Sequence, residues 1–407
     1  MTKKIEIIIS EIERRIVASQ INKIKDQDLF IGKLSIAYTC FHLYNTNKKI
    51  EYLDKMTDIL NDVFNDIEKN TSLLLDNMSL VSGIPGLGLF LHQMNKKIDL
   101  DNLNIEQIKV ITTTVYNKCI NEISKENFDY FYGSAGLLFY LLEVDEYQKV
   151  EEIINIIYDY ATKNSFLFFN KVDDPYSNGI NFGYAHGSFA LLAIFLKINN
   201  IGIQKKKTKE IIIKTTGNLL LFSRKYINHN DVTIMHDGFD YPSYFPYNVT
   251  VAKIKNKISP KSNHTLYHFT NRLGWCNSDL SRMYLLYKIG KTFNLLSYIT
   301  VADELAKEIL LRRHYKDTAV SDCYMCHGSS GIANIYKRTF ELTGNILFHE
   351  AYEYWIKRTV VYVEKELMHP PMDDDLGLLT GLLGPLFVLN EYNNKECKGW
   401  DNLFLLS

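Results

Sequence analysis

The segment Cys323-Tyr324-Met325-Cys326-His327-Gly328-Ser329-Ser330-Gly331 ends in a turn of small residues that leads into an apolar run. A turn of this kind followed by an apolar run occurs seven times along the chain, and each copy is expected to start a helix. Glycine suits such turns because it lets the backbone approach its neighbours closely and take positive φ. The copies lie at 32–37, 83–88, 133–137, 186–191, 278–281, 328–331 and 381–384.

The intervals between successive turns are mostly about fifty residues long, which is room for two helices and two short connections. Within them, apolar residues recur at three- and four-residue spacing, the pattern of helices. Strand-like alternation is scarce, so the chain is predicted to be all-α. Seven helical hairpins either stack as an open solenoid or close into a ring, and closure would bring the turns together. The predicted interval helices cover 51–70, 105–118, 150–163, 208–226, 297–313 and 348–367.

The composition is that of a folded globular protein without a large charge imbalance. The chain has 407 residues, is 46% hydrophobic and carries a formal net charge of -1. A charge so close to zero gives no electrostatic footprint for nucleic acid or for an anionic membrane surface. The six cysteines are too sparse for a disulfide scaffold and favour a reducing compartment, so we expect a cytoplasmic protein.

Two apolar segments bear on export and membrane insertion. The apolar start of the chain is interrupted by Glu6 and followed by further charges, so an amphipathic first helix fits better than an export signal. The nearly uncharged run from Leu376 to Leu389 is shorter than a membrane span and contains glycine and proline. We therefore expect no stable membrane insertion.

Cysteine and histidine are adjacent at Cys326 and His327, and Cys276 precedes another of the turns. Two thiolates and an imidazole are a ligand set that prefers zinc, and three protein ligands leave a fourth position open, as in catalytic sites. Two other interpretations stay open. The three side chains can be buried structural residues, and Cys323 completes the Cys-x-x-Cys-His pattern of c-type haem attachment.

The seven turns, the Trp275-Cys276 pair, Cys326-His327-Gly328 and Ala185-His186-Gly187 together resemble the lanthionine synthetase C family, the stand-alone lanthipeptide cyclases. The resemblance covers about residues 30 to 390. It implies one domain over 1–407, an α/α toroid of seven inner and seven outer helices with zinc at the mouth of a central cavity. It also implies thioether ring formation, in which peptide cysteines add to dehydroalanine or dehydrobutyrine. The partners would be the dehydrated precursor peptide and a separate dehydratase.

The resemblance assigns the zinc ligands to Cys276, Cys326 and His327. Trp-Cys is usually followed by Tyr-Gly in the family, whereas this chain has Asn277 and Ser278. The tyrosine thought to assist catalysis is therefore missing, and asparagine cannot supply a phenol proton. The departure at 277 and 278 leaves the three expected metal ligands in place.

The same resemblance places an active-site histidine at His186, an acidic residue at Asp129 and an arginine at Arg272. Thiolate attack on a dehydro residue produces an enolate that needs a proton, and an imidazole titrates near working pH, so His186 is the expected donor. Asp129 would orient His186, and Arg272 would stabilise the developing negative oxygen or hold Asp129. Structural roles stay open for all three: a core or cap histidine, a helix cap and an ion pair.

Two functions besides the cyclase stay open. One is addition of another thiol, such as glutathione, to dehydrated residues. The other is a catalytically impaired zinc-binding scaffold that holds peptide for a partner dehydratase, suggested by Asn277 and Ser278.

The interval before the fifth turn is longer than the others, and the excess lies at about 228–269. This segment has no helical period and is expected to be an irregular insertion, either a lid or peptide-contacting loop or an elaborated surface loop. The acidic run from Asp373 to Asp375 is expected to be a solvated loop and helix cap, or a contact for a basic leader peptide.

Overall fold

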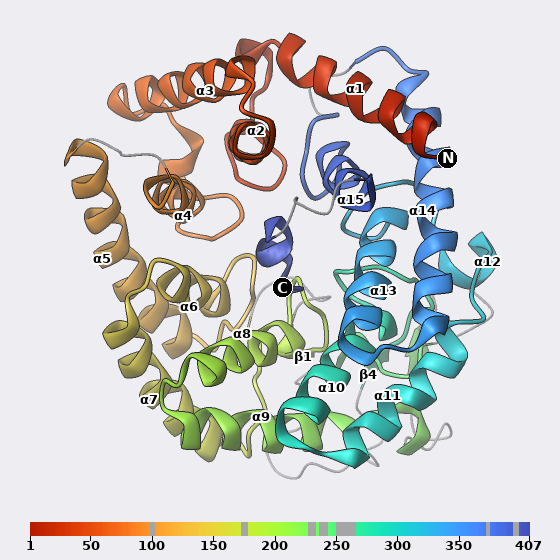
Figure 1. Ribbon diagram of the computed structural model, residues 1–407. Helices are drawn as coiled ribbons and strands as arrows, with labels where there is room; N and C mark the ends of the chain where they lie inside the picture. Colours follow the sequence, from red (N-terminus) through yellow and green to blue (C-terminus); the bar gives the residue numbers. More distant parts are fainter. Residues whose placement is uncertain are drawn as a thin grey trace. The chain divides into compact units, whose positions relative to one another are not determined.

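The protein is described here by a computed structural model that covers residues 1–97, 102–171, 178–226, 233–235, 243–249, 266–371, 375–393 and 399–407 (Figure 1). The chain divides into two compact units. Unit 1 consists of Met1–Thr113 and Ser321–Ser407, and unit 2 consists of Thr114–Val320. The single domain expected over 1–407 stays a prediction.

A helix begins at each of the seven predicted turns. In unit 1 these helices are α2 (Lys33–Asn47), α4 (Ile84–Asn95), α13 (Ser329–Thr343) and α15 (Leu383–Asn393). In unit 2 they are α6 (Ser134–Glu143), α8 (Ser188–Ile201) and α10 (Asp279–Phe293). They are buried around most of their circumference, as α6 shows with an unbroken buried run from Ser134 to Leu142. A helix that is apolar on all sides needs neighbours on all sides, so these are the inner helices of their units.

The helices of the intervals between turns, together with the helix before the first turn, are buried on one face only. Unit 1 contains α1 (Thr2–Ala18), α3 (Ile50–Glu68) and α14 (Ile346–Leu367), and unit 2 contains α7 (Tyr147–Lys163), α9 (Lys205–Leu220) and α11 (Leu296–Ile309). A seventh, α5 (Asn102–Ser124), runs from unit 1 into unit 2. In unit 1, α3 packs on α2 and α14 on α13; in unit 2, α7 packs on α6, α9 on α8 and α11 on α10 (Figure 1).

These pairs confirm the predicted helical hairpins, and α1 confirms the amphipathic first helix. The short α12 (Tyr315–Thr318) and several 3-10 turns complete the helical part of the described chain. Within that part, no helix combines the length and the apolarity needed to cross a membrane.

Glycine stands at these turns because the backbone comes too close for a side chain. A Cβ atom at Gly133 would lie 2.8 Å from the carbonyl oxygen of Asn127, and one at Gly83 would lie 2.1 Å from the carbonyl oxygen of Asn77. The expected positive φ is wrong at these two positions: φ is -132° at Gly133 and -123° at Gly83, so both are extended. Close approach alone requires the glycine.

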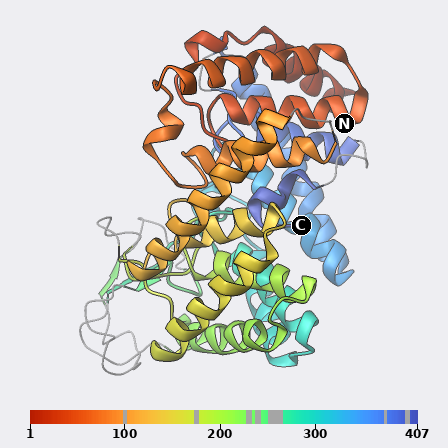
Figure 2. The same ribbon diagram turned by 90° about the vertical axis from the view of Figure 1, so that its left-hand side faces the viewer.

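Unit 2 also contains a small sheet with the strand order β1-β3-β4-β2. The strands are β1 (Ile180–Asn181), β2 (Thr233–Met235), β3 (Asn248–Val249) and β4 (Leu266–His268). β2 and β4 are parallel, and the other two pairs are antiparallel. Figure 2 shows short strands at the edge of this unit, beside its helices. Three of the strands fall in the predicted irregular insertion at 228–269, most of which lies outside the described residues.

The C-terminal residues pack into unit 1 through the 3-10 helix at Trp400–Phe404. The Trp400 ring stacks on Phe387 with centroids 5.0 Å apart. Arg338 of α13 ties this segment down, because its Nε lies 2.7 Å from an Asp401 oxygen and its Nη2 lies 3.0 Å from Glu391. The two carboxylates are almost fully buried, and Lys337 also pairs with Glu391, so Arg338 is the cation on which Asp401 depends.

Candidate metal centre

The loop that carries Cys276 is held by backbone contacts within unit 2. The Cys276 carbonyl oxygen accepts hydrogen bonds from the backbone N–H of Tyr184 at 2.8 Å and of Ala185 at 3.2 Å. Gly183 makes this approach possible, because a Cβ atom there would lie 2.7 Å from the same oxygen. Trp275 beside it is fully buried, and its ring lies near that of Tyr184. Cys276 is thereby fixed next to the turn that leads to His186.

His186 and Asp129 contact each other directly. The His186 Nδ1 atom and an Asp129 carboxylate oxygen are 2.8 Å apart, and the other Asp129 oxygen accepts the backbone N–H of Tyr132 at 2.8 Å. Asp129 is only 4% exposed, whereas the His186 side chain is 35% exposed. The carboxylate keeps the imidazole proton on Nδ1 and leaves Nε2 as the nitrogen that can exchange a proton. Asp129 thus contacts the histidine and a backbone N–H of the turn, whereas α6 itself has no side-chain cap. The role of Asp129 in orienting His186 stays a prediction.

Two aromatic rings flank the imidazole. The Tyr132 ring is nearly parallel to the His186 ring, with centroids 6.0 Å apart and an interplanar angle of 13°. Phe131 meets the same imidazole edge-on at 5.4 Å. Tyr132 is half exposed, at 52%, so an accessible phenol lies beside the histidine. Nothing in the sequence distinguished this tyrosine from the other tyrosines.

The Asp129 oxygens meet His186 and the Tyr132 N–H, one each, so the proposed contact of Arg272 with Asp129 stays a prediction. The Arg272 Nε atom is buried and has no hydrogen-bond partner in the part of the chain that the structure describes. Its backbone N–H is bonded to the Thr270 hydroxyl at 3.2 Å. The role of Arg272 in stabilising a negative oxygen stays a prediction.

Cys326 and His327 lie in the turn before α13, in unit 1. The Cys326 N–H donates to the Leu379 carbonyl oxygen at 3.0 Å, which anchors the turn. The His327 Nε2 atom lies 3.8 Å from a carboxylate oxygen of Asp322. Asp322 also accepts the Tyr324 N–H at 2.9 Å, and this hydrogen bond stabilises the turn.

Cys323 differs from its neighbour Cys326. It is fully buried, and burial raises the pKa of its thiol well above the usual range, so it is an unreactive packed thiol. The five cysteines in the described residues are free of disulfides. Among the residues that the structure describes, the group of possible metal ligands does not include Cys323, and its buried side chain gives the haem-attachment pattern no structural support.

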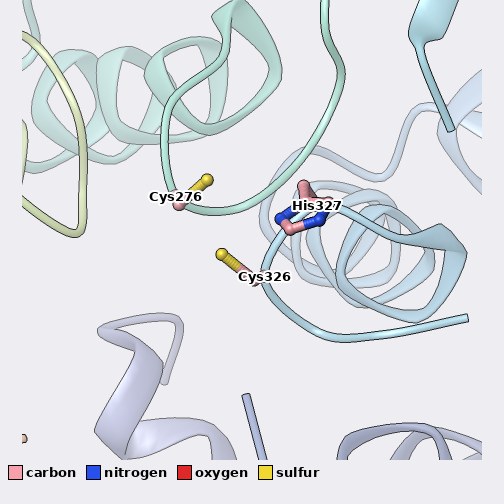
Figure 3. Close-up of side chains that lie close together, drawn as sticks. All are labelled: Cys276, Cys326 and His327. Carbon is pink, nitrogen blue, oxygen red and sulfur yellow. The ribbon is translucent and has the colours of Figure 1, made fainter. Parts of the chain in front are cut away.

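Cys276, Cys326 and His327 form a group that can hold a metal ion. One ligand atom from each, together three, all lie within 4.8 Å of one another. Figure 3 shows the two sulfur atoms and the imidazole ring close together. Ligands of a tetrahedral zinc ion lie about 3.5–4 Å apart, given Zn–S and Zn–N distances of about 2.3 and 2.0 Å. Both the spacing and the donor chemistry therefore fit zinc.

Arg282 is a further polar residue of this region that the sequence did not single out. It lies in α10 and is fully buried, and its guanidinium contacts Asn277 beside Cys276. Burial lowers the pKa of Arg282, and attraction to Asp279 and Cys276 opposes this shift. The guanidinium nevertheless stays protonated, because the ordinary pKa of arginine is so high.

Comparison with known proteins gives a family and a fold. A family model described as "Lanthionine synthetase C-like protein" matches residues 23–405. Among solved structures, the chain is similar to nisin cyclase, with a TM-score of 0.67 and 17% sequence identity over 99% of this chain and 97% of that chain. The search of curated proteins finds no match. The similarity to nisin cyclase confirms the predicted all-α class and α/α-toroid fold, and the family match confirms the predicted resemblance.

Proposed function

Because the chain belongs to the lanthionine synthetase C-like family, we propose that it is a lanthipeptide cyclase. The reaction is addition of a peptide cysteine thiol to dehydroalanine or dehydrobutyrine, which forms a lanthionine or methyllanthionine ring. The observation that carries the proposal is the grouping of Cys276, Cys326 and His327 at metal-binding distances. The His186–Asp129 pair adds a proton-exchanging group with a fixed orientation.

The proposed cofactor is a zinc ion held by Cys276, Cys326 and His327. When bound, zinc deprotonates a coordinated thiol, which at neutral pH would otherwise be mostly protonated. Two protein thiolates and a neutral imidazole balance the charge of the ion, so the protein ligands favour an electron-rich substrate sulfur. Three protein ligands leave a fourth position for that sulfur.

Residues of this chain would transfer the proton that the addition requires. Formation of the carbon–sulfur bond at the β-carbon leaves an electron pair at the α-carbon, and a proton must arrive there to complete the addition. We assign this step to His186, whose imidazole can carry the proton that the substrate thiol gives up. Asp129 holds the ring by its Nδ1–H and stabilises the imidazolium form. Arg272 would stabilise negative charge on the substrate carbonyl oxygen.

The proposed partners follow from this chemistry. The substrate is a dehydrated precursor peptide, so a dehydratase must act first, and we propose that it is a separate protein. The proposed location is the cytoplasm, where thiols stay reduced, and it fits the lack of disulfides among the five described cysteines.

The test is a thiol assay on a peptide that carries one cysteine and one dehydroalanine. Cyclisation leaves the peptide mass unchanged, so the product is treated with an alkylating reagent and the loss of alkylatable thiol is measured. The protein should remove the thiol, and Cys326→Ala should abolish this activity. Cys323→Ala is the matched control, because this neighbour is buried outside the ligand group.

The other outcomes identify the alternatives. If the peptide binds but its thiol remains alkylatable, the protein is a peptide-binding scaffold. If added glutathione raises the peptide mass while the peptide's own cysteine stays free, the protein catalyses addition of an external thiol. Either result overturns the cyclase proposal.

A further inference from the structure

Arg282 is a charged residue with no exposed surface. It lies in the first turn of α10, a few residues after Cys276, and its relative exposure is 0%. A guanidinium loses several kcal/mol of hydration on burial, and hydrophobic residues of similar size can often replace a buried ion pair without loss of stability. Burial of Arg282 is therefore poor evidence that it stabilises the fold, and its role has to be inferred from its contacts.

The contacts of Arg282 join separate segments of unit 2. Its Nε donates to the Phe182 carbonyl oxygen at 3.3 Å, and its Nη1 donates to the Phe245 carbonyl oxygen at 3.3 Å and to Asp279 at 3.0 Å. Its Nη2 donates to the side-chain oxygen of Asn277. The planar guanidinium thus fixes the directions of four acceptors at once.

Asp279 is the buried anion that pairs with Arg282. Its carboxylate is 1% exposed and accepts the backbone N–H groups of Tyr244 at 2.5 Å and Phe245 at 3.2 Å, besides pairing with Arg282. The buried charges are therefore balanced and hydrogen-bonded. Asn277 is the one Arg282 partner that belongs to the loop carrying a proposed metal ligand.

The Cys276 loop is held on two sides as a result. The Tyr184 and Ala185 N–H groups hold the Cys276 carbonyl oxygen, and Arg282 holds the side chain of the next residue, Asn277. Cys276 is itself half buried, so its sulfur direction depends on this backbone. Groups that orient metal ligands from behind typically change metal affinity 10- to 100-fold when removed.

We propose that Arg282 is a positioning residue for the metal centre: by holding Asn277, it fixes the direction in which Cys276 presents its sulfur and so sets the affinity for zinc. The inference rests on the proposed zinc site. It gives Asn277 a definite task in this chain, which is to receive the guanidinium rather than to donate a proton.

The experiment uses Asn277→Ala in the full chain, because removing Arg282 itself could prevent folding by leaving Asp279 buried and unpaired. Zinc affinity is measured by competition with a chromophoric chelator, and the melting temperature is measured on the metal-free protein. We expect roughly 10- to 100-fold weaker zinc binding for Asn277→Ala. Asn277→Asp keeps an acceptor oxygen for the guanidinium and should bind zinc nearly as tightly as the wild type.

Asn345→Ala is the matched control. Asn345 is an exposed cap whose side chain accepts the Leu347 N–H at 3.0 Å at the start of α14, so its loss should lower stability slightly and leave zinc affinity unchanged. If Asn277→Ala binds zinc as tightly as the wild type, the positioning role is overturned while the zinc site stands. If the wild type itself binds no zinc, the zinc site and this inference both fall.

Discussion

The pair formed by His186 and Asp129 offers the sharpest test of the proton-transfer step. Asp129→Asn replaces one carboxylate oxygen by an amide nitrogen and changes the shape very little. The remaining oxygen can still accept the Tyr132 N–H, which is now held at 2.8 Å. The amide nitrogen, however, is a donor where His186 needs an acceptor, so it favours the opposite imidazole tautomer. The variant therefore separates the capping role of Asp129 from its role towards the histidine.

The contact geometry sets the size of the effect. A hydrogen bond to a charged group contributes about 1.5–3 kcal/mol, and the upper end applies to pairs removed from water. Asp129 is buried, but the His186 side chain is 35% exposed, so solvent screens the pair and the lower half of the range applies. A loss of about 1.5–2 kcal/mol in the transition state corresponds to a roughly 10- to 30-fold slower reaction.

The assay is the rate of thiol loss from a dehydrated peptide at saturating concentration, measured for the wild type and for Asp129→Asn. The melting temperature of the variant should stay close to that of the wild type, because the cap is retained. A variant that cyclises at the wild-type rate would refute the role of Asp129 in orienting His186. A variant that loses activity only by unfolding would show that Asp129 is a structural cap.

Three further changes test the structure around the site and the core. Gly183→Ala places a methyl group 2.7 Å from the Cys276 carbonyl oxygen and should weaken zinc binding in a chelator competition. Arg338→Ala leaves the buried Asp401 carboxylate without its cation, whereas Glu391 keeps Lys337, and should cost about 3–5 kcal/mol in denaturant unfolding. The exposed Lys225→Ala should cost about 0–1 kcal/mol. Burial lowers the pKa of His42 to about 4. As the pH falls from 6.5 to 4, the unfolded chain therefore binds a proton at His42 that the folded chain does not, and the free energy of unfolding decreases. His42→Leu should lose less stability than the wild type over that pH range in thermal melts.

The repeating turns could be predicted from the sequence because packing dictates their residues. At Gly133 and Gly83 the neighbouring segment leaves no space for a Cβ atom, so small residues recur wherever an inner helix begins. The ligand types of the metal centre were also visible, since thiolate and imidazole donors are rare enough beside such turns to be noticed. The family resemblance, rather than spacing alone, selected Cys276 as their partner.

The parts that could not be predicted depend on contacts between distant segments. Arg282 is one arginine in an apolar helix, and its acceptors include the carbonyl oxygens of Phe182 and Phe245, which no sequence pattern marks. The short strands could not be predicted because segments of two or three residues are too brief to show an alternation of apolar and polar residues. The stacking of Tyr132 on His186 depends on ring orientation, which the sequence does not contain.

The zinc content of the purified protein is the most direct measurement. We predict roughly one zinc per chain in the wild type and in Cys323→Ala, and little or none in Cys276→Ala. Each of the two variants removes one thiol sulfur, but of these two sulfurs only that of Cys276 belongs to the group with Cys326 and His327. Zinc retained at the wild-type level by Cys276→Ala, or absent from the wild type, would contradict the account.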